Sequence, residues 1–191
     1  MHSLEAAPGP LRPASPRKSP MSHPSTSPPS ALWLGDIRPG MCLGMPAFDC
    51  SAELVAAYAG LFDAHHPIHV DAEFAKTTRY GRPIAHGPLV VAKALAMLGD
   101  VFGEALQVLL GVNGWCFYGP VYVGDRVAPA CTVLAVNASR GGRAGAVEVE
   151  LRVLGADGSL AQRGTASVLV ARQPAENLRP DLTIHPSPTE P

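Results

Sequence analysis

The segment LVVAKALAMLGDVF, residues 89–102, places the strongest constraint on the fold, because a helix built from it is apolar on nearly every side. A helix of this kind is stable only when other elements cover it. Pro88 precedes the segment, at a position where proline is favoured in the first turn of a helix. We therefore expect one long buried helix that needs a second layer of structure around it.

The chain after this helix has the pattern of β-strands. Four valine-rich segments, partly with alternating apolar and polar residues, follow one another at residues 105–121, 126–140, 146–156 and 160–173. Turn residues separate the later segments, at Gly141–Gly142 and at 156–159. The sequence predicts three or four antiparallel strands in a row, in an α+β fold whose sheet wraps the apolar helix.

Short helices and loops are predicted before the apolar helix. Residues 31–50 are expected to form a loop that leads into a short strand. Ser51 and Asp71 are good helix N-caps, so helices are predicted at 52–62 and 72–79. Proline and glycine mark the two intervening stretches, HHPIH and YGRPIAHGP, as loops.

The distribution of the 20 prolines divides the chain into three parts. Eight lie in residues 1–30 and five in residues 174–191, while the stretch between has an ordinary density. Segments rich in proline and serine do not bury enough apolar surface to fold. The sequence therefore predicts a single domain over residues 31–173 with a disordered tail on each side.

Charge and cysteine content narrow the class of protein. The 191 residues carry a net charge of −1 at pH 7, which argues against a nucleic-acid-binding protein because such proteins need a basic excess. No apolar run approaches the roughly 20 residues that span a bilayer. The four cysteines, Cys42, Cys50, Cys116 and Cys131, form no C-x-x-C pair, which is typical of reduced thiols. We expect a cytoplasmic protein that binds neither nucleic acid nor membrane.

Histidines and aspartates gather around the two loops before the apolar helix. The cluster contains Asp63, His65, His66, His69, Asp71 and His86. Three interpretations are open: the side chains cap helices, bind a metal ion, or transfer protons near neutral pH, for which imidazole is well suited. The spacing matches no closed zinc pattern, so no metal site is predicted.

The start of the apolar helix adds a group that stabilises negative charge. The N–H of Gly87 would have no partner within the helix, and the helix dipole places partial positive charge there. A thioester carbonyl bound to this N–H would be polarised toward its enolate, and such a donor is worth on the order of 10²–10³ in rate. A nearby histidine or aspartate could then move a proton or activate water.

The stretch HHPIHVDAEFAKTTRYGRPIAHGPLV and the later segment YGPVYVGDRV carry a resemblance to a known family. They resemble the signature of the MaoC-like dehydratases, which include the (R)-specific enoyl-CoA hydratases. The family pattern runs G-D-x-N-P-[IL]-H-x-D, then a short helix, then G-x-x-x-A-H-G-x-L, and later P-V-x-x-G-D. The matching residues are Pro67, Ile68, His69, Asp71, Ala75, Gly81, Ala85, His86, Gly87, Leu89, Pro120, Val121, Gly124 and Asp125.

The resemblance implies a hot-dog fold, in which a curved antiparallel sheet wraps a long helix, and a homodimer or higher homo-oligomer. The implied activity is reversible hydration of a 2-enoyl thioester on coenzyme A or acyl carrier protein, with no metal or nicotinamide cofactor. In the family an aspartate and a histidine hold the water, and a glycine N–H polarises the thioester. Carried over, His69 takes the histidine role and Gly87 the carbonyl-binding role.

The family's aspartate does not carry over directly. Aligning on Pro67 puts Ala64 where that aspartate belongs and Asp63 one residue further away. We predict that Asp63 and His69 form the catalytic pair, with His65, His66 and His86 as candidates for a supporting role. The alternative is a hot-dog module that binds an acyl thioester or a partner subunit without turnover. A hot-dog thioesterase, which would release free thiol, is a third class.

Overall fold

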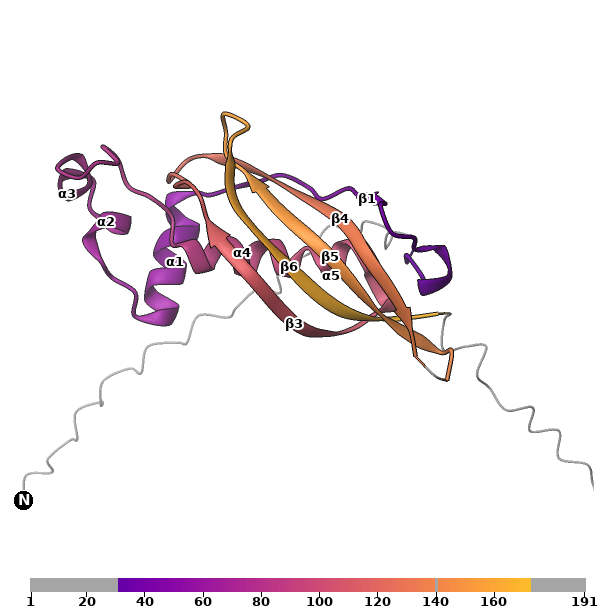
Figure 1. Cartoon of the computed structure of the whole chain (residues 1–191). Helices are drawn as coiled ribbons and strands as arrows, with labels where there is room; N and C mark the ends of the chain where they lie inside the picture. The colour runs from indigo at the N-terminus through magenta and orange to yellow at the C-terminus, as the bar shows by residue number, and fades with distance from the viewer. Residues whose placement is uncertain (1–30, 140, 173–191) are drawn as a thin grey trace, which may run out of the picture.

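The computed structural model describes residues 31–139 and 141–172, and the tails predicted at 1–30 and 174–191 lie outside the described residues (Figure 1). The strands are β1 (Cys42–Leu43), β2 (Phe48–Asp49), β3 (Leu106–Phe117), β4 (Arg126–Ala138), β5 (Ala144–Leu154) and β6 (Leu160–Ala171). The helices are η1 (Leu34–Asp36), α1 (Ala52–Phe62), α2 (Pro67–Val70), α3 (Ala72–Lys76), α4 (Gly87–Ala96), α5 (Leu98–Phe102) and η2 (Gly103–Ala105). The predicted α+β class is confirmed.

The long strands form one antiparallel sheet in the order β1-β4-β5-β6-β3, with β2 paired to β4. β4, β5 and β6 make a meander, as predicted from the turn residues between them. The first valine-rich segment differs, because β3 pairs with β6 at the far edge and not with β4. No two-residue turn follows Phe117; the chain instead runs past the loop before α4, where Tyr122 pairs with Ile84 in an isolated bridge.

The central helix consists of α4 and α5, which are separated by Met97. Figure 1 shows it lying along one face of the curved sheet. Its buried side chains are Leu89, Val90, Ala94, Met97, Leu98 and Phe102. Ala92 and Lys93 are exposed, so the apolar helix is buried on its sheet side and not all round, because the sheet covers one face only. Among the described residues, no helix has both the length and the apolar character to cross a bilayer.

The sheet supplies the other side of the core. In β5, alternate residues are buried, and Val147, Val149, Leu151 and Val153 are completely inaccessible to solvent. Alternate side chains of a strand share one face, so this row packs toward the helix. Of the four free thiols, two are also buried, and burial raises the pKa of Cys50 to about 11 and that of Cys131 to about 12.

Three short helices, α1, α2 and α3, lie together at one end of the sheet (Figure 1). The Ser51 hydroxyl accepts a hydrogen bond from the Leu54 N–H at 3.2 Å, and the Asp71 carboxylate accepts from the N–H groups of residues 73 and 74. Both predicted caps are thus confirmed. The stretch predicted as a loop at HHPIH contains α2, because Pro67 occupies the first turn of a helix, where its missing N–H costs nothing.

Candidate functional site

A cavity of about 380 Å³ lies where the helical end meets the sheet. His69 from α2 and Gly87 from the start of α4 both line it. The remaining lining residues come from the loop before α4, the end of β3 with the segment after it, and β6: Arg79, Tyr80, Ile84, Ala85, Phe117, Tyr118, Gly119, Pro120, Val121 and Gln162. The imidazole and the helix start that the sequence singled out therefore share one cavity.

His69 is held in a defined tautomer. Its Nδ1 lies 2.8 Å from the carbonyl oxygen of Ile84, and since a carbonyl only accepts, Nδ1 carries the proton. The lone pair is then on Nε2. Burial lowers the pKa of His69, and the charges of His86 and His66 lower it further, although the hydrogen bond to Ile84 acts in the opposite direction. The ring is thus favoured in its neutral form, which accepts a proton at Nε2.

Gly87 is the first residue of α4, so its N–H has no partner within the helix. The Phe117 ring packs against it so closely that a Cβ added at Gly87 would lie 2.7 Å from Phe117 Cε1. On the other side, Gln162 Nε2 lies 3.5 Å from the Gly87 carbonyl oxygen, and Trp115 Nε1 donates to Gln162 Oε1 at 3.1 Å. These contacts fix the first turn of α4 at the edge of the cavity.

His86 lies directly behind His69. It is 5% exposed, and its Nε2 donates to the carbonyl oxygen of Ala64 at 2.8 Å. The His86 and His69 rings are stacked, with their centroids 3.8 Å apart and their planes 29° from parallel. Among the described residues, nothing forms a hydrogen bond with His86 Nδ1.

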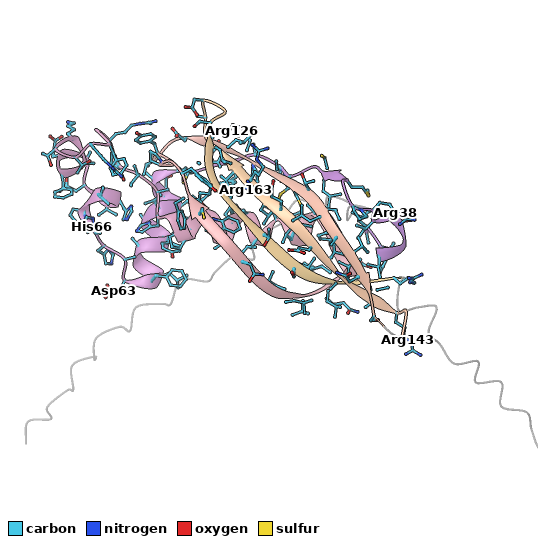
Figure 2. All side chains as sticks on the ribbon, viewed as in Figure 1. Arg38, Asp63, His66, Arg126, Arg143 and Arg163 are labelled. Atoms are coloured by element: carbon cyan, nitrogen blue, oxygen red, sulfur yellow. The ribbon has the colours of Figure 1, made fainter. Side chains whose placement is uncertain are left out.

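Asp63 lies away from this cavity. It ends α1 in the left-handed conformation, with φ 52°, and its side chain is 99% exposed. Figure 2 shows it at the outer end of α1. Its carboxylate is 3.5 Å from His65 Nε2, and both side chains are largely exposed. The structure brings His69, His86 and Gly87 together, whereas Asp63 and His65 form a separate pair on the surface.

His66 caps α2 and lies next to His69. Its Nδ1 accepts a hydrogen bond from the Ile68 N–H at 3.3 Å, so it caps α2. Its ring is in edge contact with the rings of His69, at 6.2 Å between centroids, and Phe74, at 6.0 Å. His66 is labelled in Figure 2 beside α2. Among the described residues, no three His, Cys, Asp or Glu side chains are grouped so as to hold a metal ion.

Asp125, in the segment YGPVYVGDRV, stabilises the loop that holds His69. The Asp125 carboxylate accepts from Arg82 Nη2 at 2.9 Å and from the Tyr122 N–H at 3.2 Å. The Arg82 guanidinium also lies over the Tyr122 ring, 4.0 Å from its centroid. Asp125 thus ties the segment after β3 to the loop that presents the Ile84 carbonyl to His69.

Sequence reasoning missed several residues of the cavity wall. Tyr80 and Tyr118 line it, as does Gln162, which is 2% exposed. A signal was present for Gln162, because a glutamine in an otherwise valine-rich strand requires buried hydrogen-bond partners. Tyr118 and Tyr80 gave no such signal, because only the folded chain brings their segments together.

The segment that contains these residues also matches known proteins. A family profile described as MaoC like domain matches residues 39–154. The (R)-specific enoyl-CoA hydratase of Aeromonas caviae is 33% identical over 114 residues, which are 60% of this chain and 81% of that protein.

Solved structures of similar proteins have the same fold. A MaoC-like dehydratase from Rhodospirillum rubrum superimposes with a TM-score of 0.66 at 28% identity, covering 75% of this chain and 99% of that one. A Mycobacterium tuberculosis protein with a double hot-dog fold gives a TM-score of 0.67 over 75% of this chain and 45% of that one. Its 19% identity shows the fold alone. Because the profile spans more than half of the sequence, the chain belongs to the MaoC-like dehydratase domain family and has the hot-dog fold.

Proposed function

We propose that this protein is a hydratase or dehydratase, a carbon–oxygen lyase that adds water to, or removes it from, the double bond of a 2-enoyl thioester. The carrier of the acyl group would be coenzyme A or acyl carrier protein. The observation that supports the proposal is that the neutral His69 ring and Gly87, the first residue of α4, line the same cavity. The (R)-specific enoyl-CoA hydratase relative supports the same reaction class.

In the proposed reaction the thioester carbonyl accepts a hydrogen bond from the Gly87 N–H at the positive end of α4. His69 Nε2 takes a proton from water while the water oxygen bonds to the β-carbon, and the π electrons move onto the carbonyl oxygen as an enolate. The enolate then collapses, and the α-carbon receives the proton from His69. Nothing is oxidised or reduced, so the reaction calls for no nicotinamide or flavin.

Asp63 is the second group that we propose for holding the water. Its carboxylate is exposed at the end of α1, so this role requires residues 63–66 to turn it toward the cavity when substrate binds. The Asp63→Asn variant tests the requirement, because it keeps the shape of the side chain and removes the charge. If Asp63 holds the water, this variant loses activity; if His69 works without it, activity is retained.

The test of function is hydration of crotonyl-CoA, followed by loss of the enoyl absorbance. Purified protein should convert it, and His69→Ala should reduce the rate by at least about 10²-fold, since general base catalysis contributes about that much. Undiminished turnover by His69→Ala would refute the assignment of the base. A parallel assay for released thiol separates hydration from thioester hydrolysis.

A second candidate function is a module that binds an acyl thioester without turnover. The exposure of the Asp63 carboxylate and the alanine at position 64 favour it. This candidate predicts that a non-hydrolysable acyl-CoA analogue raises the melting temperature of the protein while no enoyl thioester is consumed. Consumption of substrate by the wild-type protein would exclude it.

We also propose that the protein acts as a homodimer. β3 forms one edge of the sheet, and it exposes Val108, Leu109, Leu110 and Val112. An apolar edge strand is a template for pairing with another chain, and two copies of β3 would continue the sheet across the interface. We also propose a cytoplasmic location, because the cysteine pattern is typical of reduced thiols.

A further inference from the structure

The imidazole of His69, which lines the cavity, is stacked on that of His86, whose candidate supporting role has not yet been given a mechanism. His86 and His69 face each other at 3.8 Å between ring centroids, closer than the other aromatic pairs found in the described residues. Each ring donates one hydrogen bond to a carbonyl oxygen, His69 to Ile84 and His86 to Ala64. Both hydrogen bonds are 2.8 Å long, so the rings are held in register from two different loops.

Among the described residues that line the cavity, no carboxylate is present to pair with a proton added to the stack. The charged group among them is Arg79, a cation. The start of α4, with its partial positive charge, follows His86 directly. The other titratable groups around the two rings are His66, Tyr58, Tyr80 and Tyr118. Two imidazolium ions at this separation would repel each other strongly, because little water lies between the faces of stacked rings.

We propose that His86 is a positioning residue that keeps the His69 ring oriented and in its neutral form, with Nε2 free to accept a proton from water. The inference rests on the proposed function in that His69 is the base. His86 acts in two ways: its ring supplies a flat surface that fixes the plane of His69, and any positive charge on it opposes protonation of His69. Burial is the largest cause of the lowered pKa of His69, and the charge of His86 lowers that pKa further, which is the sign that this arrangement requires.

The hydrogen bond from His86 to Ala64 gives a competing, purely structural account. Ala64 follows Asp63 in the loop between α1 and α2, so His86 also ties that loop to the start of α4. A structural tie and an electrostatic effect are separable, because a glutamine at position 86 can still donate to the Ala64 carbonyl but cannot bind a proton. A phenylalanine keeps the stacking surface and loses both the donor and the charge.

The experiment is a pH titration of the His69 ring by NMR on protein with ¹³C-labelled histidine, with the signal assigned from its absence in His69→Ala. We expect both His86→Phe and His86→Gln to raise the pKa of His69 by about half to one unit, within the spread that protein environments produce. Tyr58→Phe is the control: its ring lies 4.9 Å from that of His86, and the change leaves the stack intact, so the titration of His69 should be unchanged.

An unchanged His69 titration in both variants would overturn the proposal. So would a shift in His86→Phe alone, because only the loss of the hydrogen bond to Ala64 would then explain it. Because His86→Gln keeps the donor, it also serves if His86→Phe fails to fold. The titration does not depend on turnover, so a protein that shows the shift but hydrates no enoyl thioester would refute the proposed function and not this inference. Where turnover is present, the acid limb of kcat/KM should move to higher pH with the titration.

Discussion

The missing side chain at Gly87 sets the shape of the candidate site. The Phe117 ring lies against the first turn of α4, in the space where a Cβ would be 2.7 Å from Cε1. No positive φ is involved, so the requirement is for space and not for an unusual backbone conformation. The N–H that we assign to the thioester carbonyl is therefore presented beside an aromatic ring, in a position that any larger residue would disturb.

We predict that Gly87→Ala lowers kcat/KM for an enoyl thioester by about tenfold or more, because misplacing the carbonyl by a fraction of an ångström disturbs the reacting geometry. Phe117 is half exposed, so its ring can move aside without unfolding the domain. Gly99→Ala is the matched control, because nothing lies within 4 Å of its added Cβ and the residue is helical. Equal activity of Gly87→Ala and wild type would contradict the role of this N–H.

The lowered pKa of His69 predicts how the protein responds to acid. The base works only when neutral, so hydration should persist below the ordinary histidine value of 6.5 and fail at the lower pH where His69 becomes charged. The unfolded chain binds this proton more tightly than the folded one, so stability falls as pH decreases from about 6.5. The assignment would be contradicted if, on acidification, the rate already fell at a pH above 6.5 while the protein remained folded.

At the scale of elements, the site depends on contacts between two loops. The Ile84 carbonyl that orients His69 belongs to a loop that is paired with the segment after β3, through the Ile84–Tyr122 bridge and the hydrogen bond from the Ala85 N–H to Val121. Asp125 holds this arrangement by accepting from Arg82 and from the Tyr122 N–H. The Asp125 side chain is 11% exposed, whereas that of Arg82 is 54% exposed, so water is largely excluded from the carboxylate but not from the guanidinium.

We predict that Asp125→Ala lowers the free energy of unfolding by about 1.5–3 kcal/mol, the usual cost of losing hydrogen bonds to a charged group. Urea denaturation measures this value, and activity should fall with it because the Ile84 carbonyl loses its support. Asp49→Ala is the control: its ion pair with Arg126 is mostly exposed, so its loss should cost at most about 1 kcal/mol. Similar costs for the two substitutions would show that Asp125 is an ordinary surface group.

The elements that local chemistry determines could be predicted from the sequence. Ser51 and Asp71 cap their helices because their side chains accept from N–H groups a few residues away, which needs no information from the rest of the fold. The helix α2 was missed, because Pro67 is equally typical of a loop and of a first helical turn. The break at Met97 was missed because the apolar pattern continues through it.

At the scale of the whole molecule, the unpaired side of β3 is the feature with the largest consequence. We predict that Leu110→Lys converts a dimer into a monomer, because a buried lysine at an edge-to-edge interface loses its hydration. Sedimentation measures the mass. Leu61→Lys is the matched control, since Leu61 is exposed on α1, away from β3. A wild-type monomer, or a dimer in both variants, would contradict an interface at β3.

Long-range pairing is also where the sequence was least informative. The pattern identified β3 as a strand, but its neighbour β6 lies across the whole meander, and alternation carries no record of which strand pairs with which. The direction of the Asp63 carboxylate was likewise not predictable. It follows from the left-handed conformation of Asp63 at the end of α1. Aspartate tolerates this conformation, but an aspartate in the sequence does not predict it. His69 and Gly87 were predicted twice, from the histidine cluster and the start of the apolar helix and from the family pattern, and the structure places both on one cavity.

The hydrogen bond from His86 Nε2 goes to the carbonyl oxygen of Ala64, so the methyl group of Ala64 takes no part in it. The family pattern has an aspartate at this position, whereas here the peptide oxygen of Ala64 makes the contact with His86. That oxygen would remain after a change of side chain. Ala64→Asp is therefore a natural starting point for protein engineering, because it would place a carboxylate where the family pattern has its aspartate while the hydrogen bond that anchors the loop is kept.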